Sequence, residues 1–140
     1  MQSKTDAFFH GKIKNCVFLI HAMAQHILVV DDEIDLSETF SELLQMLGYS
    51  ASYATSLETA LSLMRSQIFD VVISDIHMPA GDGMRLRTLM LADECLRKTP
   101  FIYMTGKTDE LPNLNEPFLV KPFSTDDVVA ILEEVLPVQP

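Results

Sequence analysis

The sequence predicts an open α/β fold, in which helices cover both faces of a parallel sheet. From residue 26 onward, short apolar runs of strand length alternate with amphipathic segments of helical spacing. The apolar runs suit strands buried on both faces, because parallel strands need crossover helices that cover them. With 140 residues and 48% hydrophobic content, the chain is long enough for one domain with its own core.

The first strand is predicted at residues 27–30, a fully apolar run that stops at Asp31, Asp32 and Glu33. A helix follows it, and Gly48 is typical of its C-terminal cap. The apolar face of this helix is predicted to consist of Leu36, Phe40, Leu43, Leu44 and Leu47.

A second strand is predicted at residues 50–54 and a second helix after it. Thr55 and Glu58 have the spacing of a capping box, and apolar residues recur at helical spacing through Met64. The β-branched run at 69–75 predicts a third strand, ended by a turn that contains Pro79, Gly81 and Gly83.

A third helix is predicted at residues 84–96, and strands four and five at 100–105 and 117–120. Ser124 is expected to cap the last helix, which Pro137 ends. Methionines within the helical patterns are expected to fill gaps in the core; these are Met46, Met64 and Met90.

Composition excludes several classes of function. A net charge of −10 is the wrong sign for binding nucleic acid directly. The two cysteines, Cys16 and Cys95, lie far apart and have no metal-site or disulfide spacing, which favours a reducing, cytoplasmic setting. The apolar run at 16–20 is far below the ~20 residues of a membrane span, so we expect no membrane insertion.

Residues 1–25 are interpreted as an N-terminal extension to a domain at 26–137. Lys4, Lys12 and Lys14 against Asp6 give the extension a charge of +2, which leaves −12 for the rest of a chain whose total is −10. The apolar stretch is too short for a signal peptide. The extension is expected to be a loosely attached arm, or to lie upstream of a true start at Met23.

Three acidic residues are expected at the carboxyl ends of neighbouring strands, where ligands bind in open α/β sheets. Asp31 and Asp32 follow strand one, and Asp75 ends strand three. Bringing three carboxylates together is unfavourable unless a cation shares them, and oxygen ligands suit Mg²⁺. The sequence therefore predicts a magnesium site.

A hydroxyl and an ammonium group are expected at the same edge. Thr105 ends strand four and Lys121 follows strand five, and together they could hold a phosphoryl group beside the metal. A carboxylate can attack phosphorus and form an aspartyl phosphate, for which Asp75 is the candidate nucleophile.

These residues resemble the receiver domain of two-component response regulators. The similarity covers about residues 26–136, and its motifs occur in family order: Asp31 and Asp32; Asp75, Met78, Pro79, Gly81 and Gly83; Thr105; Lys121, Pro122 and Phe123. The resemblance implies the flavodoxin-like receiver fold with strand order 2-1-3-4-5. It implies a phosphorylation switch rather than an enzyme, and we expect a single-domain regulator with no effector domain after Pro140.

The resemblance also implies a role for each site residue. Asp75 would accept the phosphoryl group from a histidine kinase or phosphotransfer protein. Asp32, Asp75 and the backbone carbonyl of His77 would bind Mg²⁺, with Asp31 acting through metal-bound water. Thr105 would contact a phosphoryl oxygen and Lys121 would pair with the phosphate.

A switch of protein–protein contact is the output that the resemblance implies. Phe118 stands at the family's aromatic switch position and would respond to Thr105, so that a downstream protein target reads the state. Phe118 could equally be a core aromatic residue. His77 and Lys107 occupy positions that resemble those modulating hydrolysis of the acyl phosphate, which predicts an altered lifetime.

The segment between Gly106 and Pro117 departs from the family pattern. It has ten residues, too few for a helix of average length, ~11–12 residues, and its two loops. Helix four is therefore predicted to be short, irregular or absent. This leaves one alternative open, a receiver-like interaction module that is never phosphorylated. A second alternative, a Mg²⁺-dependent phosphohydrolase, is disfavoured because no carboxylate follows two residues after Asp75.

Overall fold

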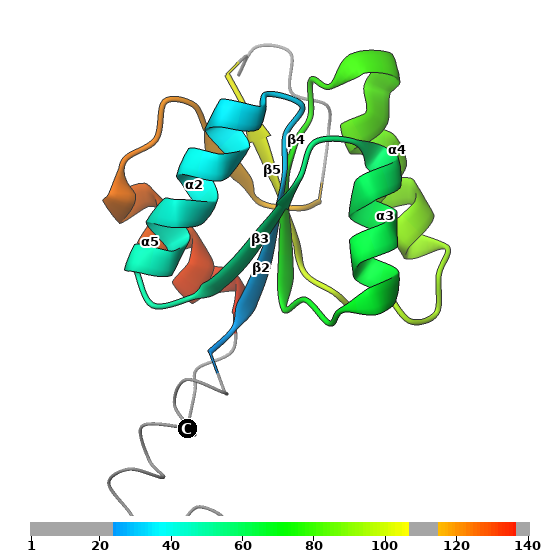
Figure 1. Cartoon of the computed structure of the whole chain (residues 1–140), viewed down its shortest axis with the longest axis horizontal. Coiled ribbons are helices and arrows are strands. Elements are labelled where there is room, and N and C mark those ends of the chain that lie inside the picture. Colours follow the sequence, from blue (N-terminus) through cyan, green and yellow to red (C-terminus); the bar gives the residue numbers. More distant parts are fainter. Residues whose placement is uncertain (1–23, 107–114, 137–140) are drawn as a thin grey trace, which may run out of the picture.

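A computed structural model of the chain describes residues 24–106 and 115–136. Within these residues, five strands form one parallel sheet in the order β3-β2-β4-β5-β6 (Figure 1). The strands are β2 (His26–Val30), β3 (Ser50–Ala54), β4 (Val71–Asp75), β5 (Phe101–Thr105) and β6 (Phe118–Val120). Counted along the chain this is the order 2-1-3-4-5, so the predicted fold class and strand order are confirmed.

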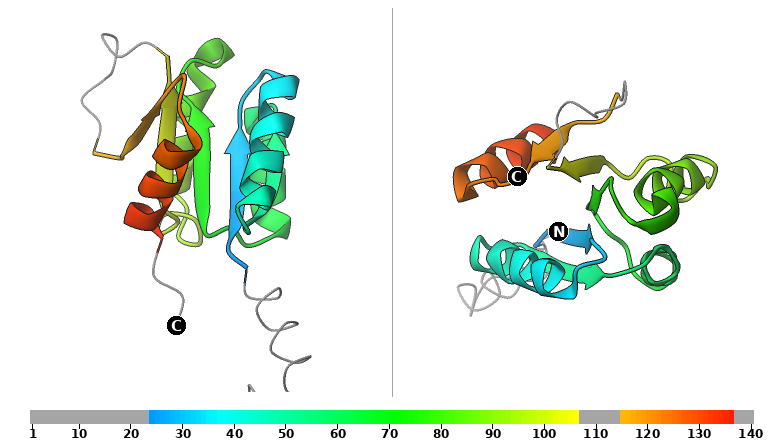
Figure 2. Two further views of the ribbon diagram at one scale, coloured as in Figure 1. Left: turned by 90° about the vertical axis from the view of Figure 1, so that its left-hand side faces the viewer. Right: turned by 90° about the horizontal axis from the view of Figure 1, so that it is seen from above.

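Helices cover both faces of the sheet, as a doubly wound fold requires. Seen from above, α2 and α5 lie on one side of the strands and α3 and α4 on the other (Figure 2). The helices are α2 (Ile34–Met46), α3 (Leu57–Ser66), α4 (Asp82–Leu91) and α5 (Thr125–Val135), with a short 3₁₀ turn, η1, at Pro79–Gly81 before α4.

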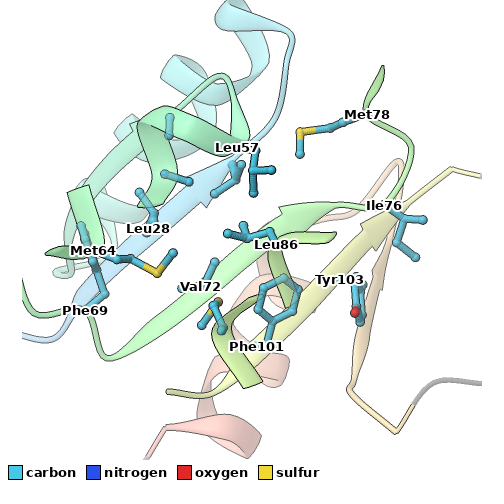
Figure 3. Close-up of a cluster of buried hydrophobic side chains, with 14 residues drawn as sticks. Leu28, Leu57, Met64, Phe69, Val72, Ile76, Met78, Leu86, Phe101 and Tyr103 are labelled. Carbon is cyan, nitrogen blue, oxygen red and sulfur yellow. The ribbon is translucent and has the colours of Figure 1, made fainter. Parts of the chain in front are cut away.

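The side chains of each strand belong to two separate hydrophobic cores, because successive side chains of a strand point to opposite faces of the sheet. In β2, Leu28 and Val30 belong to the core under α3 and α4, whereas Ile27 and Val29 belong to the core under α2 and α5. Figure 3 shows the first core, in which strand residues such as Val72 meet helix residues of α3 and α4. Because both faces of the sheet are buried, the strand ends, where the predicted site residues lie, have fixed positions.

Two helix starts illustrate how the caps form. The predicted capping box of Thr55 and Glu58 is wrong by one residue: Ser56 is the N-cap, and its side chain accepts a hydrogen bond from the Thr59 N–H at 3.1 Å. The cap expected at Ser124 is confirmed, and it forms a complete capping box with Asp127. Both caps satisfy backbone N–H groups that the first turn leaves without a helical partner.

The predicted helix at 84–96 is displaced: α4 begins earlier, at Asp82, and ends at Leu91. Gly81 precedes it with a φ of 69°, a left-handed conformation that glycine adopts without strain. After the helix, the Asp93 side chain accepts a 2.8 Å hydrogen bond from the Cys95 N–H. A side chain that binds a nearby backbone N–H competes with helical bonding, which explains the earlier end.

The buried face of α2 also differs from the prediction. Its fully or nearly buried positions are Ser37, Phe40, Ser41 and Leu44. Leu36 is half exposed, and Met46, expected in the core, is exposed. The helical period is predicted correctly, but the buried face is rotated relative to the prediction, so that Ser37 and Ser41 point inward.

Several predictions fall partly or wholly outside the described residues. These are the N-terminal extension, the short helix four and any role of Lys107. Among the helices of residues 24–106 and 115–136, none combines the length and hydropathy needed to cross a membrane.

Candidate functional site

The strand order brings the predicted site residues to one edge of the sheet. Because all strands are parallel, their carboxyl ends meet at the upper edge in Figure 1. Asp31 follows β2, Asp75 ends β4, which pairs with β2, and Thr105 ends β5. Lys121 follows β6, the strand next to β5.

The three predicted carboxylates lie together. One oxygen from each of Asp31, Asp32 and Asp75 lies within 4.8 Å of the others. Asp31 and Asp75 are only 2% and 8% exposed, whereas Asp32 is exposed. Oxygens that share one octahedral Mg²⁺ lie about 3 Å apart when they are neighbours and about 4 Å apart when they are opposite, since Mg²⁺–oxygen distances are about 2.1 Å. The donor set and its spacing therefore fit a hard divalent cation after a small adjustment.

Lys121 supplies a positive charge to this acidic cluster. Its Nζ lies 3.0 Å from Asp31 Oδ2 and 3.5 Å from Asp75 Oδ2. Burial by itself would lower the pKa of Lys121, but the hydrogen bond to Asp31 and the charges of Asp75 and Asp31 outweigh it. The net effect is a raised pKa, so the ammonium form is favoured at this position.

Asp75 is held from two sides. Its Oδ1 accepts a 3.1 Å hydrogen bond from the backbone N–H of the exposed His77, while its Oδ2 faces Lys121. Gly83, in the first turn of α4, packs so closely that a Cβ there would overlap the carbonyl oxygen of Asp75. The absence of a side chain at residue 83 thus allows α4 to pack directly against the end of β4.

Thr105 and Phe118 belong to β5 and to the edge strand β6, on one side of the site. Thr105 is fully buried, and its carbonyl accepts a 2.7 Å hydrogen bond from the Lys121 N–H. Phe118 is the first residue of β6, in register with Tyr103 of β5, and packs partly buried against the core that contains Tyr103. Strand pairing thus connects both residues to the segment that carries Lys121.

Ser37 contacts the backbone of Asp31, a role that the sequence analysis does not predict. Its hydroxyl donates a 2.7 Å hydrogen bond to the backbone carbonyl of Asp31. The available signal was a serine within an apolar helical pattern, three residues before Phe40. The pattern alone does not say that this serine faces the β2–α2 loop.

Comparisons with known proteins agree with this geometry. A family model described as "Response regulator receiver domain" matches residues 27–133. The response regulator SaeR of Staphylococcus aureus is 31% identical over 117 residues, which cover 79% of this chain and 50% of SaeR. The transcriptional regulatory protein ZraR of Escherichia coli is 32% identical over 114 residues, 79% of this chain and 26% of ZraR. The chain spans about half the length, or less, of the curated relatives it matches.

Solved structures share the fold. The chemotaxis response regulator CheY4 of Vibrio cholerae superposes with a TM-score of 0.72 at 29% identity, covering 81% of this chain and 100% of CheY4. The receiver domain of the sensor histidine kinase PA1611 of Pseudomonas aeruginosa gives the same TM-score at 24% identity, covering 80% and 97%. That structure holds a magnesium ion in its active-site cleft.

The family match covers most of the chain, and the parallel sheet and its strand order are those expected of this family. The chain belongs to the receiver domain family of two-component response regulators, whose members are phosphorylation-dependent signalling domains rather than classical enzymes.

Proposed function

We propose that Asp75 accepts a phosphoryl group from a histidine kinase or a phosphotransfer protein, and that phosphorylation changes contact with a downstream protein target. The proposal covers a receiver unit at residues 26–137, acting in the cytoplasm. The observation that carries it is the position of the Asp75 carboxylate, which lies 3.5 Å from Lys121 and within 4.8 Å of two other carboxylates.

In the transfer step, a carboxylate oxygen of Asp75 attacks the phosphorus atom of the donor. A new oxygen–phosphorus bond forms while the bond from phosphorus to the donor's imidazole nitrogen breaks, and the imidazole leaves with the electron pair and takes up a proton. Catalysis of such a step consists of positioning and charge neutralisation. Lys121 supports both, because its ammonium group already lies beside Asp75 and can pair with the incoming phosphoryl oxygens.

Asp32, Asp75 and the backbone carbonyl of His77 would hold Mg²⁺, with Asp31 acting through bound water. When bound, the ion neutralises negative charge on the phosphoryl oxygens. The grouping of the three carboxylates supports this assignment, and so does the magnesium ion described in the similarly folded receiver of PA1611.

Thr105 and Phe118 are the proposed switch pair. The Thr105 hydroxyl would contact a phosphoryl oxygen, and the partly buried ring of Phe118 would respond by changing its packing. The support is their connection through the pairing of β5 with β6, in which Thr105 lies opposite Val120 and Tyr103 opposite Phe118.

The test incubates the purified protein with acetyl phosphate, with and without Mg²⁺, and follows the intact mass. Wild type is expected to gain one phosphoryl group only when Mg²⁺ is present. Asp75→Asn is expected to gain none, because an amide is a poor nucleophile. Asp126→Asn is the matched control, since Asp126 is an exposed aspartate at the start of α5 and should leave the gain intact.

The alternatives give other results. A protein that binds Mg²⁺ but steadily hydrolyses added phosphomonoesters would be a phosphohydrolase. A protein that neither binds Mg²⁺ nor gains mass would contradict the proposal and favour a receiver-like interaction module that is never phosphorylated.

A further inference from the structure

A buried hydrogen bond joins helix α2 to the loop that carries two of the acidic residues. The Ser37 hydroxyl donates to the backbone carbonyl of Asp31 at 2.7 Å. Both residues are almost completely buried, Ser37 at 0% and Asp31 at 2% exposure. A buried carbonyl that loses its donor costs free energy, so this bond constrains the loop strongly.

The donor is directed to Asp31 more than to its other neighbour. The Ser37 hydroxyl also lies 3.1 Å from the Glu33 carbonyl, but that oxygen already accepts the Ser37 N–H at 3.0 Å. A hydroxyl carries one proton. The shorter distance assigns that proton to the Asp31 carbonyl. Among the described residues, Ser37 is the donor to that carbonyl oxygen.

The other polar groups of Asp31 are fixed as well. Its N–H donates to the Ala54 carbonyl at 3.1 Å, its Oδ1 accepts the Glu33 N–H at 3.0 Å, and its Oδ2 accepts from Lys121. Strand β3, the loop and the end of β6 therefore each hold one group of this residue. Ser37 adds the contact that ties the residue to α2.

The carbonyl of Asp31 belongs to the peptide plane that leads into Asp32. Because a peptide is planar, fixing this carbonyl also fixes the direction in which the Asp32 backbone starts. Asp32 is exposed, so packing restrains it less than it restrains Asp31. This peptide plane thus fixes the start of the backbone from which the Asp32 carboxylate reaches the other two.

We propose that Ser37 is a positioning residue for the divalent-cation site: by holding the Asp31 carbonyl, it keeps the Asp32 carboxylate in reach of the ion. This inference rests on the proposed function, because it assumes that the three carboxylates bind Mg²⁺. Ser37 itself does not contact the ion.

Ser41 provides a matched control on the same helix. It is also buried, one turn further along α2, and its hydroxyl donates to the Glu38 carbonyl at 3.1 Å. Ser41→Ala removes a hydroxyl of the same kind and leaves the β2–α2 loop unchanged. A loss of Mg²⁺ affinity that depends only on the stability of α2 should therefore be similar in Ser37→Ala and Ser41→Ala.

The experiment titrates Mg²⁺ into the ¹⁵N-labelled full chain and follows backbone amide signals for wild type, Ser37→Ala and Ser41→Ala. Urea unfolding in EDTA gives the stability of each protein. Ser37→Ala is expected to weaken Mg²⁺ binding about 10-fold, the lower end of the range for losing an outer-shell partner of a metal site. It should also shift the Asp32 amide signal before any metal is added. Ser41→Ala should leave the Mg²⁺ affinity within about twofold of wild type.

Two results overturn the inference: Mg²⁺ affinities of wild type and Ser37→Ala within about twofold, or equal weakening in both serine variants. If wild type itself binds no Mg²⁺, the proposed function fails, which is a different result. If Ser37→Ala does not fold, Ser37→Cys and Ser41→Cys are compared by the same criteria, because a thiol keeps the shape but donates weakly.

Discussion

The ammonium group of Lys121 lies 3.0 Å from Oδ2 of Asp31, although 90 positions separate the two residues in the chain. The same nitrogen lies 3.5 Å from Oδ2 of Asp75. One ammonium group after the edge strand β6 therefore interacts with two buried carboxylates at the ends of the interior strands β2 and β4. Asp32 adds a third negative charge to the cluster. One lysine does not balance three carboxylates, and the remaining charge is what a divalent cation would neutralise.

Mg²⁺ should therefore stabilise the folded chain. At a concentration 100 times the dissociation constant, we expect the free energy of unfolding to rise by about 2.7 kcal/mol. Asp32→Asn should lose most of this response, while its stability in EDTA rises slightly because a like charge is removed. Urea unfolding with Mg²⁺ or EDTA measures both quantities. Asp126→Asn should respond to Mg²⁺ as wild type does, and an equal response in Asp32→Asn would contradict the assignment.

A side chain at residue 83 should destabilise the folded protein. A Cβ at this residue would overlap the carbonyl oxygen of Asp75, so α4 would have to move away from β4. We expect Gly83→Ala to lower the free energy of unfolding by about 2 kcal/mol. Gly106→Ala is the control, since among the residues that the structure describes a Cβ there meets only the Lys121 Cβ, at 3.9 Å. It should change stability by less than about 0.5 kcal/mol. Equal losses in the two variants would refute the steric explanation.

Arg87 and Glu116 should be energetically coupled. They form a 2.9 Å ion pair between α4 and the segment before β6, with side chains only 13% and 19% exposed. A double-mutant cycle with Arg87→Met and Glu116→Gln, measured by urea unfolding, should give a coupling energy of about 1 kcal/mol. The cycle cancels the separate contact of Arg87 with the Phe101 ring.

A second ion pair serves as the control for that cycle. Arg85 and Asp82 are paired at 2.6 Å, but the Arg85 side chain is 57% exposed. Their coupling should stay below about 0.5 kcal/mol, because solvent screens exposed pairs. If the Arg87 cycle gives no more than the Arg85 cycle, burial does not strengthen the first pair.

Alkaline pH should destabilise the protein through Tyr103. Burial and then the charge of Glu116 raise the pKa of this 1% exposed tyrosine to about 12, although Arg87 acts in the opposite direction. Between pH 10 and 12 the unfolded chain loses the phenolic proton that the folded protein keeps, so stability falls as pH rises. The loss should be about 2 kcal/mol for this group.

Tyr103→Phe isolates this contribution. Urea unfolding of wild type and of the variant across this alkaline range should show a smaller decline in the variant, because it has no phenol to titrate at residue 103. The same decline in both proteins would show that other groups control the alkaline transition.

Reasoning from the sequence predicted the type and order of the elements because the signals are local. Apolar runs mark the strands, the helical period marks the helices, and Gly48 and Ser124 mark a helix end and a helix start. The acidic residues could be placed at one edge for the same reason, since each follows or ends a strand and parallel strands share an edge. The strand order came from the resemblance to the receiver family, and the sheet confirms it.

Local pattern does not determine which face of a helix is buried when polar and apolar residues compete. In α2, Ser37 and Ser41 face inward while Met46 is exposed, because contacts with β2, β3 and the preceding loop set the helix rotation. The end of α4 was also mispredicted, since the Asp93 side chain binds the Cys95 N–H.

The pattern of residues along the chain thus predicts the fold class, the positions of most elements and the identity of the residues at the carboxyl edge. The contacts that surround those residues become visible only in the folded chain: Lys121 with Asp31, Gly83 against Asp75, and Ser37 under the Asp31 carbonyl. The two kinds of information differ in their range. Strand and helix signals depend on neighbours within a few residues, whereas these contacts join separate elements and depend on how the two layers of helices pack on the sheet.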